Sequence, residues 1–369
     1  MVYLALGIAC AIPILFLIAI RTRDLYATGK FNYVIITIVW GLIAYALAAQ
    51  INPWIWESGF ASKTTVLRVI GPILEELLKS LILIYFVRRA DFNYVVDGAL
   101  YGFGTGIGFA IIENVEYIYG HLGTAVFVAV ARVFSTNLVH ATGSGVIGAA
   151  LSTHRAKPGF RGFLWVLGGY IFSMGLHIGF NTFVNSGGFL VYAIVIGMAG
   201  FGLIYLAIRR GLDVQKEWMA EKLGDANRVT RSEVRALGNI EALDDLLKPI
   251  KIQFGEIKVE QVRKLLSIQA EMGIKTKLLD STFNASKKQE MIKIIDNLRS
   301  EMDILRKAIG PYCMMFVRGV YLSQDFNLWG SISDRIAASS TGQKGGGLWD
   351  TATSRLQGSR ELEESKEED

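Results

Sequence analysis

Charged residues are scarce in this sequence, and the shortage is confined to the first part of the chain. Only 19% of the 369 residues are charged, whereas soluble proteins carry about 25%. Residues 1–208 are nearly free of charge over long runs, and residues 209–369 are highly charged. This division excludes a single soluble domain and predicts a membrane domain followed by a soluble one.

Cysteine and early positive charge are also lacking. The two cysteines, Cys10 and Cys313, fall in different parts of the chain and predict no disulfide framework. Because Arg21 and Arg23 follow the first apolar run instead of preceding it, that run is expected to be a membrane span and not a signal peptide. The basic residues behind the net charge of +5 lie mostly in short loops, so no nucleic-acid partner is expected.

Seven apolar stretches have a length that can cross a bilayer, which takes roughly 20 residues. They cover residues 2–20, 32–51, 64–87, 95–118, 132–153, 163–184 and 188–208. The predicted fold class is therefore all-α, a polytopic membrane helix bundle of about seven spans with a soluble helical domain after it. The expected domains are a transmembrane domain at 1–210, a cytoplasmic helical domain at 211–335 and a disordered tail at 336–369.

Positive charge in the loops predicts the orientation. Four basic clusters fall on alternate connections: Arg21, Arg23 and Lys30; Arg88 and Arg89; Arg155, Lys157 and Arg161; Arg209 and Arg210. The side that carries them is cytoplasmic by the positive-inside rule. We therefore expect a multi-pass protein of the cell membrane with its N-terminus outside and its C-terminal domain in the cytoplasm. Residues 122–131 are placed at the outer interface, because a span that included them would bury Arg132.

Glycines spaced four residues apart predict close helix packing, since small residues let two backbones approach in lipid. The spacing occurs in Gly98, Gly102 and Gly106, in Gly104 and Gly108, and in Gly175 and Gly179.

Ionisable residues inside the spans are the best candidates for function. The third span carries Glu75, Glu76 and Lys79, the fourth Glu113, the fifth His140, and the sixth His177 with Asn181. Such groups are costly against lipid, so they are expected to face one another or a water-filled cavity. At about 1.5 Å per residue, the two histidines, Glu75 and Glu113 lie roughly 10–17 Å below the outer ends of their spans, which places them in one layer.

Spacing within the third span suggests a division of roles. Lys79 stands four residues from Glu75 and three from Glu76, so it can neutralise one carboxylate and leave the other for water or a proton. Pro72 cannot donate to the preceding turn, so the span is expected to kink there and open a groove beside the pair.

The order of these motifs resembles the PrsW family of intramembrane proteases, within the superfamily of the CAAX prenyl-endopeptidases. The matching residues are Glu75-Glu76-x-x-Lys79, Phe109-x-x-x-Glu113 with Asn114 next, a separate His140, and His177-x-x-x-Asn181. Glutamate at position 113 replaces the histidine of the wider superfamily, as in the PrsW branch. The resemblance covers roughly residues 64–184 and implies an intramembrane endopeptidase that cleaves membrane-embedded or membrane-anchored proteins, such as an anti-sigma factor at its first cleavage site.

The roles implied by this resemblance agree with the chemistry of the side chains. Glu75 or Glu76 would act as general base on water, with Lys79 steadying the other. His177 or His140 would share the base role or protonate the leaving amine, and Asn181 would donate to the oxyanion. The open alternative is a metal site with zinc or another divalent ion, held by Glu113, His140 and His177.

Two other predictions complete the analysis. A proton- or cation-coupled transporter is the main rival function, because buried carboxylates also mark ion paths, but no second copy of the motifs is found. In the soluble part, a heptad-like seam suggests a helical hairpin or a homodimer contact through the C-terminal helices. The seam consists of Met291, Ile295, Leu298, Met302, Leu305 and Ile309.

Overall fold

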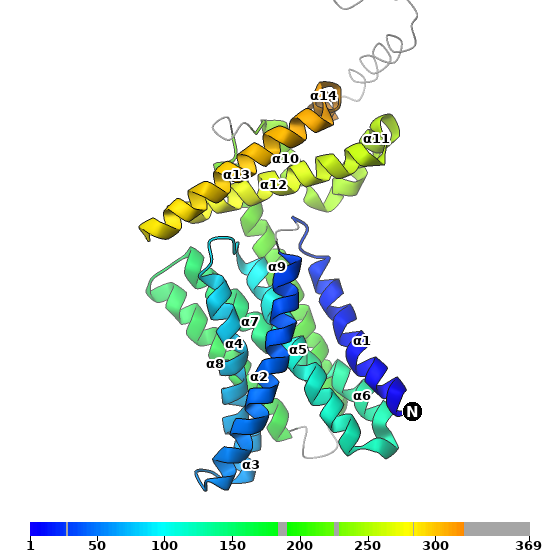
Figure 1. The fold of residues 1–369 in the computed structure, drawn as a ribbon, viewed down its shortest axis with the longest axis vertical. Coiled ribbons are helices and arrows are strands. Elements are labelled where there is room, and N and C mark those ends of the chain that lie inside the picture. Colours follow the sequence, from blue (N-terminus) through cyan, green and yellow to red (C-terminus); the bar gives the residue numbers. More distant parts are fainter. Residues whose placement is uncertain (27–28, 184–189, 225–228, 283, 321–369) are drawn as a thin grey trace, which may run out of the picture. The chain divides into compact units, whose positions relative to one another are not determined.

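The computed structural model describes residues 1–26, 29–183, 190–224, 229–282 and 284–320. These residues form helices, and none of them forms a strand (Figure 1). The prediction of an all-α fold is therefore confirmed. Contacts divide the chain into a compact unit, Met1–Gly310, and a second unit that begins at Pro311 and contains α14 (Pro311–Val320).

Six helical segments among the described residues are long and apolar enough to cross a membrane. They comprise α1 (Val2–Arg21), α2 (Phe31–Glu57), α5 (Val95–Gly120), the segment with α6 (Ala125–Phe134) and α7 (Thr136–Ala156), α8 (Phe160–Phe183) and α9 (Leu190–Lys222). Their lengths and apolar composition identify a multi-pass membrane protein.

The predicted third span is not among these six, because its helix is divided into shorter pieces. It consists of α3 (Lys63–Thr65), a π-helical turn η1 (Val66–Ile70) and α4 (Gly71–Val87), which has 17 residues. In the π-turn the N–H of Gly71 donates to the carbonyl of Val66. Pro72 follows without an N–H to continue the pattern, so the distortion lies beside the proline, as expected.

The predicted fifth span also contains a break. Ser135 separates α6 from α7, and its hydroxyl donates to the carbonyl of Ala131 at 2.6 Å. The predicted start of the span at Arg132 is wrong, because this residue lies in the last turn of α6 and the next helix begins at Thr136. A short 3-10 turn, η2 (Leu122–Thr124), precedes α6. Alanines of α6 pack against alanines of α1: Ala125 and Ala129, Ala5 and Ala9.

Helix α5 is the most buried of the spans and packs closely on α2 and α7 through its glycines. A Cβ atom at Gly102 would clash with the backbone of Ser144, and one at Gly108 with the backbone of Ile38. Gly98 and Gly106 are equally crowded by backbone, and Gly104 faces the hydroxyl of Thr37, which confirms the expected close packing of α5. The same expectation is wrong for Gly175 and Gly179, because no described atom lies within 4 Å of a Cβ built there.

The basic connections meet at one end of the bundle. Lys30, between α1 and α2, forms an ion pair with Asp91 between α4 and α5, with 2.8 Å between Nζ and Oδ2. Arg155 at the end of α7 donates to the carbonyl of Arg89 at 2.6 Å. Burial acts to raise the pKa of Asp91, but hydrogen bonds from Lys30 and Tyr33 outweigh it and lower the pKa to about 2. The basic clusters around α1, α4 and α7 are therefore on one side, as the loop charges predict.

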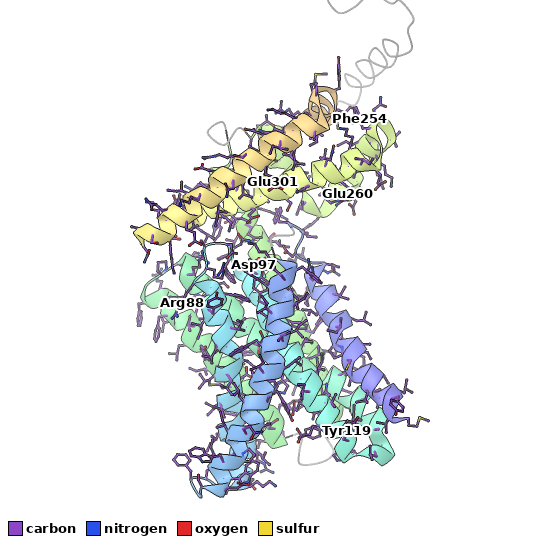
Figure 2. The ribbon with its side chains drawn as sticks, viewed as in Figure 1. Arg88, Asp97, Tyr119, Phe254, Glu260 and Glu301 are labelled. Carbon is purple, nitrogen blue, oxygen red and sulfur yellow. The ribbon has the colours of Figure 1, made fainter. Side chains whose placement is uncertain are left out.

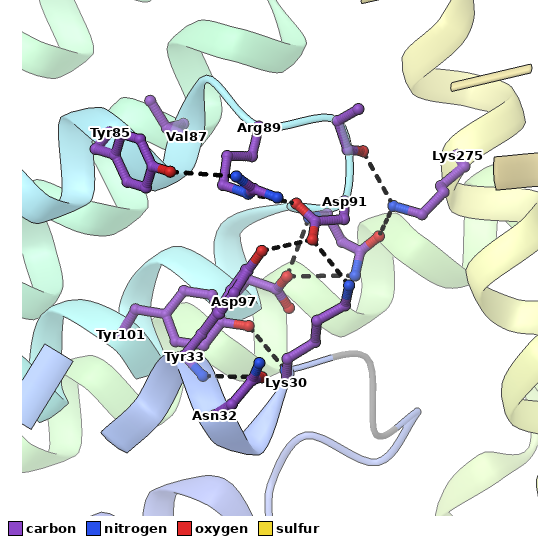
Figure 3. A network of polar contacts seen from close by, with 12 residues as sticks. Lys30, Asn32, Tyr33, Tyr85, Val87, Arg89, Asp91, Asp97, Tyr101 and Lys275 are labelled. Carbon is purple, nitrogen blue, oxygen red and sulfur yellow. Dashed lines mark hydrogen bonds and ion pairs between the residues drawn. The ribbon is translucent and has the colours of Figure 1, made fainter. Parts of the chain in front are cut away.

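The C-terminal helices are anchored at this same end. They are α10 (Arg231–Gly238), η5 (Ile240–Ala242), α11 (Leu243–Phe254), α12 (Glu256–Asp280) and α13 (Ala285–Ile309). The fully buried Lys275 of α12 donates to Asn93 Oδ1 at 3.0 Å and to the carbonyl of Ala90 at 3.2 Å (Figure 3). Desolvation by burial lowers the pKa of its ammonium. The α4–α5 connection is thus held from two sides.

The predicted seam of α13 is used within the chain. Met291, Ile295 and Leu298 are buried, and α13 packs against α12 as an antiparallel hairpin (Figure 1). This arrangement follows the hairpin alternative. The predicted domain boundary at residue 210 lies inside the continuous helix α9, so the division at that point stays a prediction, and the predicted tail lies outside the described residues.

Two glycine variants test the packing of α5. Gly102→Ala is expected to lower the thermal stability of the purified protein by an amount typical of overpacking, about 1–3 kcal/mol, because its methyl group would meet backbone that cannot move aside. Gly175→Ala, which meets no described atom within 4 Å, is the control and should be neutral. Equal unfolding temperatures for both variants in the same detergent would contradict the α5–α7 contact.

Candidate active site

The carboxylate of Glu76 is the centre of a buried polar cluster. Its side chain is 1% exposed and accepts hydrogen bonds from two helices. Lys79 Nζ lies 2.6 Å from Oε1, His177 Nδ1 lies 3.0 Å from the same oxygen, and Ser173 Oγ donates to Oε2 at 2.8 Å. Glu76 and Lys79 share a face of α4, and Ser173 and His177 share a face of α8 at a spacing of four residues. The carboxylate therefore joins α4 to α8.

Lys79 carries the cluster on to α7. Its fully buried ammonium also donates to His140 Nδ1 at 3.0 Å and lies 4.8 Å from the centroid of the Phe109 ring. The lysine thus neutralises Glu76 and not Glu75, which is one of the two pairings that the spacing predicts. The rings of His140 and His177 meet edge to face, with centroids 4.6 Å apart.

Glu75 differs from its neighbour in having weaker contacts. Its side chain is 16% exposed. Asn52 of α2 donates to its Oε1 at 3.2 Å, and its Oε2 lies 3.7 Å from His177 Nε2. Because Lys79 and Ser173 bind the adjacent carboxylate, Glu75 is the member of the pair with an oxygen left for a proton, a water molecule or a cation.

Glu113 lies on the far side of His140. Its Oε2 is 2.8 Å from His140 Nε2, and Arg132 NH2 is 2.9 Å from the same oxygen. A carboxylate accepts, so the Nε2 of His140 carries the proton and its Nδ1 accepts from Lys79. Arg132 also donates through Nε to Asn114 Oδ1 at 2.8 Å, and its guanidinium lies 3.7 Å from the centroid of the Tyr117 ring. Arg132, just before the break at Ser135, thus neutralises the carboxylate of Glu113.

Asn181 lies at the edge of this cluster, next to the π-turn. Its amide donates to the carbonyl of Leu67 at 3.1 Å. This carbonyl lacks the usual backbone donors, because the N–H of Gly71 bonds to Val66 and Pro72 has no N–H. The amide group has a second N–H that is free to donate elsewhere, so the predicted oxyanion role is compatible with this contact.

The residues present fit a catalytic metal ion. Among the described residues, candidate ligand atoms of Glu75, His140 and His177 lie within 4.8 Å of one another. Two histidines and one carboxylate with an open position are a common catalytic zinc set. His177 has its Nδ1 on Glu76 and His140 has its Nε2 on Glu113, as metal-bound histidines commonly have one nitrogen on a carboxylate. Nδ1 of His140 accepts from Lys79, so an ion held by this nitrogen would have to displace the ammonium. Glu113, which the sequence proposes as a ligand, is placed behind His140 instead.

Three contributors to the cluster, Ser173, Asn52 and Arg132, are not among the predicted site residues. Ser173 stands four residues before His177, and this helical spacing could have identified it. Asn52 comes from α2, whose contact with Glu75 has no signal in the sequence. Lys79 and Arg132 are visible as charges inside apolar stretches, but their partners His140 and Glu113 lie on other helices.

A helical membrane bundle that buries carboxylates, histidines and a lysine in one cluster has the arrangement of an intramembrane enzyme or of an ion path. The family model described as PrsW family intramembrane metalloprotease matches residues 29–207. The resemblance found in the motifs is therefore confirmed: the membrane domain belongs to the PrsW family, and the chain is an intramembrane protease of this type. Comparison with curated proteins and with solved structures gave no match.

The Glu76–Lys79 pair can be tested by a double-mutant cycle. Lys79→Met leaves the buried Glu76 without its cation, and a cost of about 3–5 kcal/mol is expected. Glu76→Gln in the same chain removes the unpaired charge and should restore part of the loss. Unfolding temperatures of the single and double variants in one detergent give the coupling, and additive losses would show that the two side chains do not depend on each other.

Proposed function

We propose that the cluster on α4, α5, α7 and α8 hydrolyses a peptide bond of a membrane-associated protein substrate, with Glu75 at the reacting centre. The contrast between the two adjacent carboxylates supports this assignment. Glu76 is held by Lys79, His177 and Ser173, whereas Glu75 keeps an oxygen 3.7 Å from His177 Nε2. A general base needs an accepting atom that is not already occupied.

The neighbouring side chains have supporting roles in this proposal. Glu76 orients His177 through Nδ1, which leaves Nε2 directed toward Glu75. In a metal-free mechanism this nitrogen passes a proton to the leaving amine, whereas with an ion present it would be a ligand instead. Glu113 and Arg132 orient His140 from the opposite side. Asn181 holds the π-turn through one N–H and offers the other to the oxyanion that forms when water attacks the carbonyl.

Glu75, His140 and His177 are the residues that would hold a divalent metal ion. A bound zinc ion supplies an activated water molecule and polarises the substrate carbonyl. We propose this set in place of Glu113, His140 and His177, because Glu113 already contacts Nε2 of His140 and an arginine. In that arrangement Glu113 and Glu76 act as the carboxylates that fix the two imidazole rings.

The surroundings of α8 support a substrate that lies in the membrane. An apolar cavity of about 400 Å³ runs along the helix that carries His177 and Asn181, lined by Gly175, Leu176, Gly179, Phe180, Phe183, Tyr192, Ala193 and Ile196. The absence of side chains at Gly175 and Gly179 leaves room for another helix to approach, as small residues do in membranes. Cleavage of a single-span protein such as a membrane-bound anti-sigma factor is the substrate class we propose.

Orientation and assembly complete the proposal. With the basic connections in the cytoplasm of a cell-membrane protein, the N-terminus lies outside and the C-terminal helices lie inside. The site, near the π-turn, then belongs to the outer half of the bilayer. The seam of Met291, Ile295 and Leu298 is covered by α12, so a homodimer through the C-terminal helices would need another surface. The exposed Ile292 and Ile304 of α13 offer one.

Glu75→Gln is the direct test of the catalytic assignment. The variant keeps the size and the Asn52 contact of the side chain, so it should fold and insert normally. Loss of a general base or metal ligand should lower the cleavage rate of a single-span substrate by at least about 100-fold. Glu116→Gln, on α5 outside the cluster, is the matched control. Wild-type rates for Glu75→Gln in purified, monodisperse protein would remove the basis of the proposal.

Metal content distinguishes the two ligand sets. Glu75→Ala and His177→Ala should each reduce bound zinc to well below one ion per chain, because each removes a ligand. Glu113→Ala should retain the site with an affinity about 10–100-fold lower, since it removes only the partner of His140. Elemental analysis after dialysis against buffered zinc gives the three values. Normal zinc in Glu75→Ala together with none in Glu113→Ala would favour the set proposed from the sequence, and an active, metal-free enzyme would exclude both.

A further inference from the structure

A second cavity, of about 390 Å³, lies at the opposite end of the bundle from the π-turn. It is formed where α4 and α7 end, beside the turn that joins α12 to α13. Its volume falls in the range of about 300–1,000 Å³ that is usual for small-molecule sites. It is lined by Ile84, Val87, Arg88, Ala90, Leu151, His154, Arg155, Ser281, Thr282, Asn284, Lys287 and Met291. The catalytic cluster uses none of these residues.

The lining of this cavity is basic and contains no carboxylate. Arg155 donates to the carbonyls of Val87 and Arg89, so its hydrogen bonds are partly used. Within the described residues, neither the Arg88 guanidinium nor the Lys287 ammonium has a carboxylate partner. Figure 2 shows Arg88 at the end of α4 that faces the C-terminal helices. His154 lies in the last turn of α7, and its Nδ1 is buried against Gly162 of α8, with no hydrogen-bond partner among the described residues.

The start of α13 adds to this positive field. Asn284 is the N-cap, and its side chain accepts from the N–H of Lys287. Carboxylates are favoured in the first turn of a helix, because the free N–H groups there carry partial positive charge. The first turn of α13 has no acidic residue and has Lys287 and Lys288 instead. Of these two, Lys287 lines the cavity, so its ammonium and the positive end of the helix both favour an anion bound there.

Polarity is distributed across the cavity as on an amphipathic ligand. Ile84, Val87 and Leu151 come from the membrane helices α4 and α7 and form an apolar wall. Polar groups come from the hairpin, with Ser281, Thr282, Asn284 and Lys287, and from the ends of α4 and α7, with Arg88, His154 and Arg155. A free anion would use only the second group, whereas a phospholipid would place its phosphate there and its glycerol and upper acyl carbons against the first.

We propose that this cavity binds the headgroup of an anionic phospholipid, with Arg88, Lys287 and the N-terminus of α13 on the phosphate. The bound lipid would link the membrane helices to the hairpin next to the connection that Lys275 already holds. It would therefore stabilise the contact between the C-terminal helices and the end of α4, the helix that carries Glu75 and Glu76.

The test uses the full chain in a neutral detergent, titrated with short-chain phosphatidylglycerol while thermal unfolding is measured. A saturable rise in unfolding temperature is expected, with little effect from short-chain phosphatidylcholine or from inorganic phosphate at equal concentration. Arg88→Gln and Lys287→Gln should each raise the midpoint of the titration on the order of fivefold. Lys288→Gln, an exposed neighbour that does not line the cavity, is the matched control and should leave the midpoint unchanged.

Three results would overturn the proposal. Equal stabilisation by phosphatidylcholine would show that the anionic headgroup is not recognised, and equal stabilisation by inorganic phosphate would show a free-anion site instead of a lipid site. An equal effect of Lys288→Gln would show diffuse surface charge in place of a built site. Peptide cleavage by the Arg88→Gln and Lys287→Gln variants in detergent without lipid provides the check on folding, because neither residue touches the catalytic cluster, and wild-type rates are expected.

Discussion

A charge inside a membrane protein is tolerated when partners surround it, and the arrangement of the active site follows from this constraint at Glu76. Its carboxylate is 1% exposed and receives Lys79 from its own helix, and Ser173 and His177 from α8. Lys79 in turn reaches His140 of α7, and His140 reaches Glu113 of α5. One buried negative charge therefore determines how four helices present their side chains to one another.

The same constraint separates the roles of two adjacent glutamates. Neighbouring residues on a helix point about 100° apart, so Lys79 and Ser173, which bind Glu76, do not also bind Glu75. Glu75 is directed toward Asn52 and His177 Nε2 and remains 16% exposed. The charge of Glu76 is balanced by its partners, and an oxygen of Glu75 stays available for chemistry.

The far end of α4 is restrained by different means. There Asp91 receives Lys30 and Tyr33, and Lys275 of α12 holds Ala90 and Asn93 (Figure 3). No described residue of α10 to α13 belongs to the catalytic cluster, yet these helices contact the connection that follows α4. The C-terminal helices are therefore in a position to influence the site through the placement of α4, without supplying a side chain to it.

Much of this protein is determined by its sequence alone. Apolar stretches of span length, basic loops on one side and glycines at four-residue spacing on α5 all arise from local composition, because the bilayer acts on each segment separately. The motifs around Glu75, Glu113, His140 and His177 likewise identify the PrsW family without coordinates. Local spacing also identifies the Glu76–Lys79 pair as one of two alternatives, and the distortion at Pro72.

Only the tertiary structure decided which of these groups meet. The choice of Glu76 over Glu75 for Lys79, the place of Glu113 behind His140 and the presence of Asn52 depend on how the faces of separate helices are rotated. The break at Ser135 and the open glycines of α8 depend on contacts that residues distant in the sequence make or leave unmade. Sequence spacing gives the face of each helix, but the angle between helices comes from packing, and the geometry of the site depends on that angle.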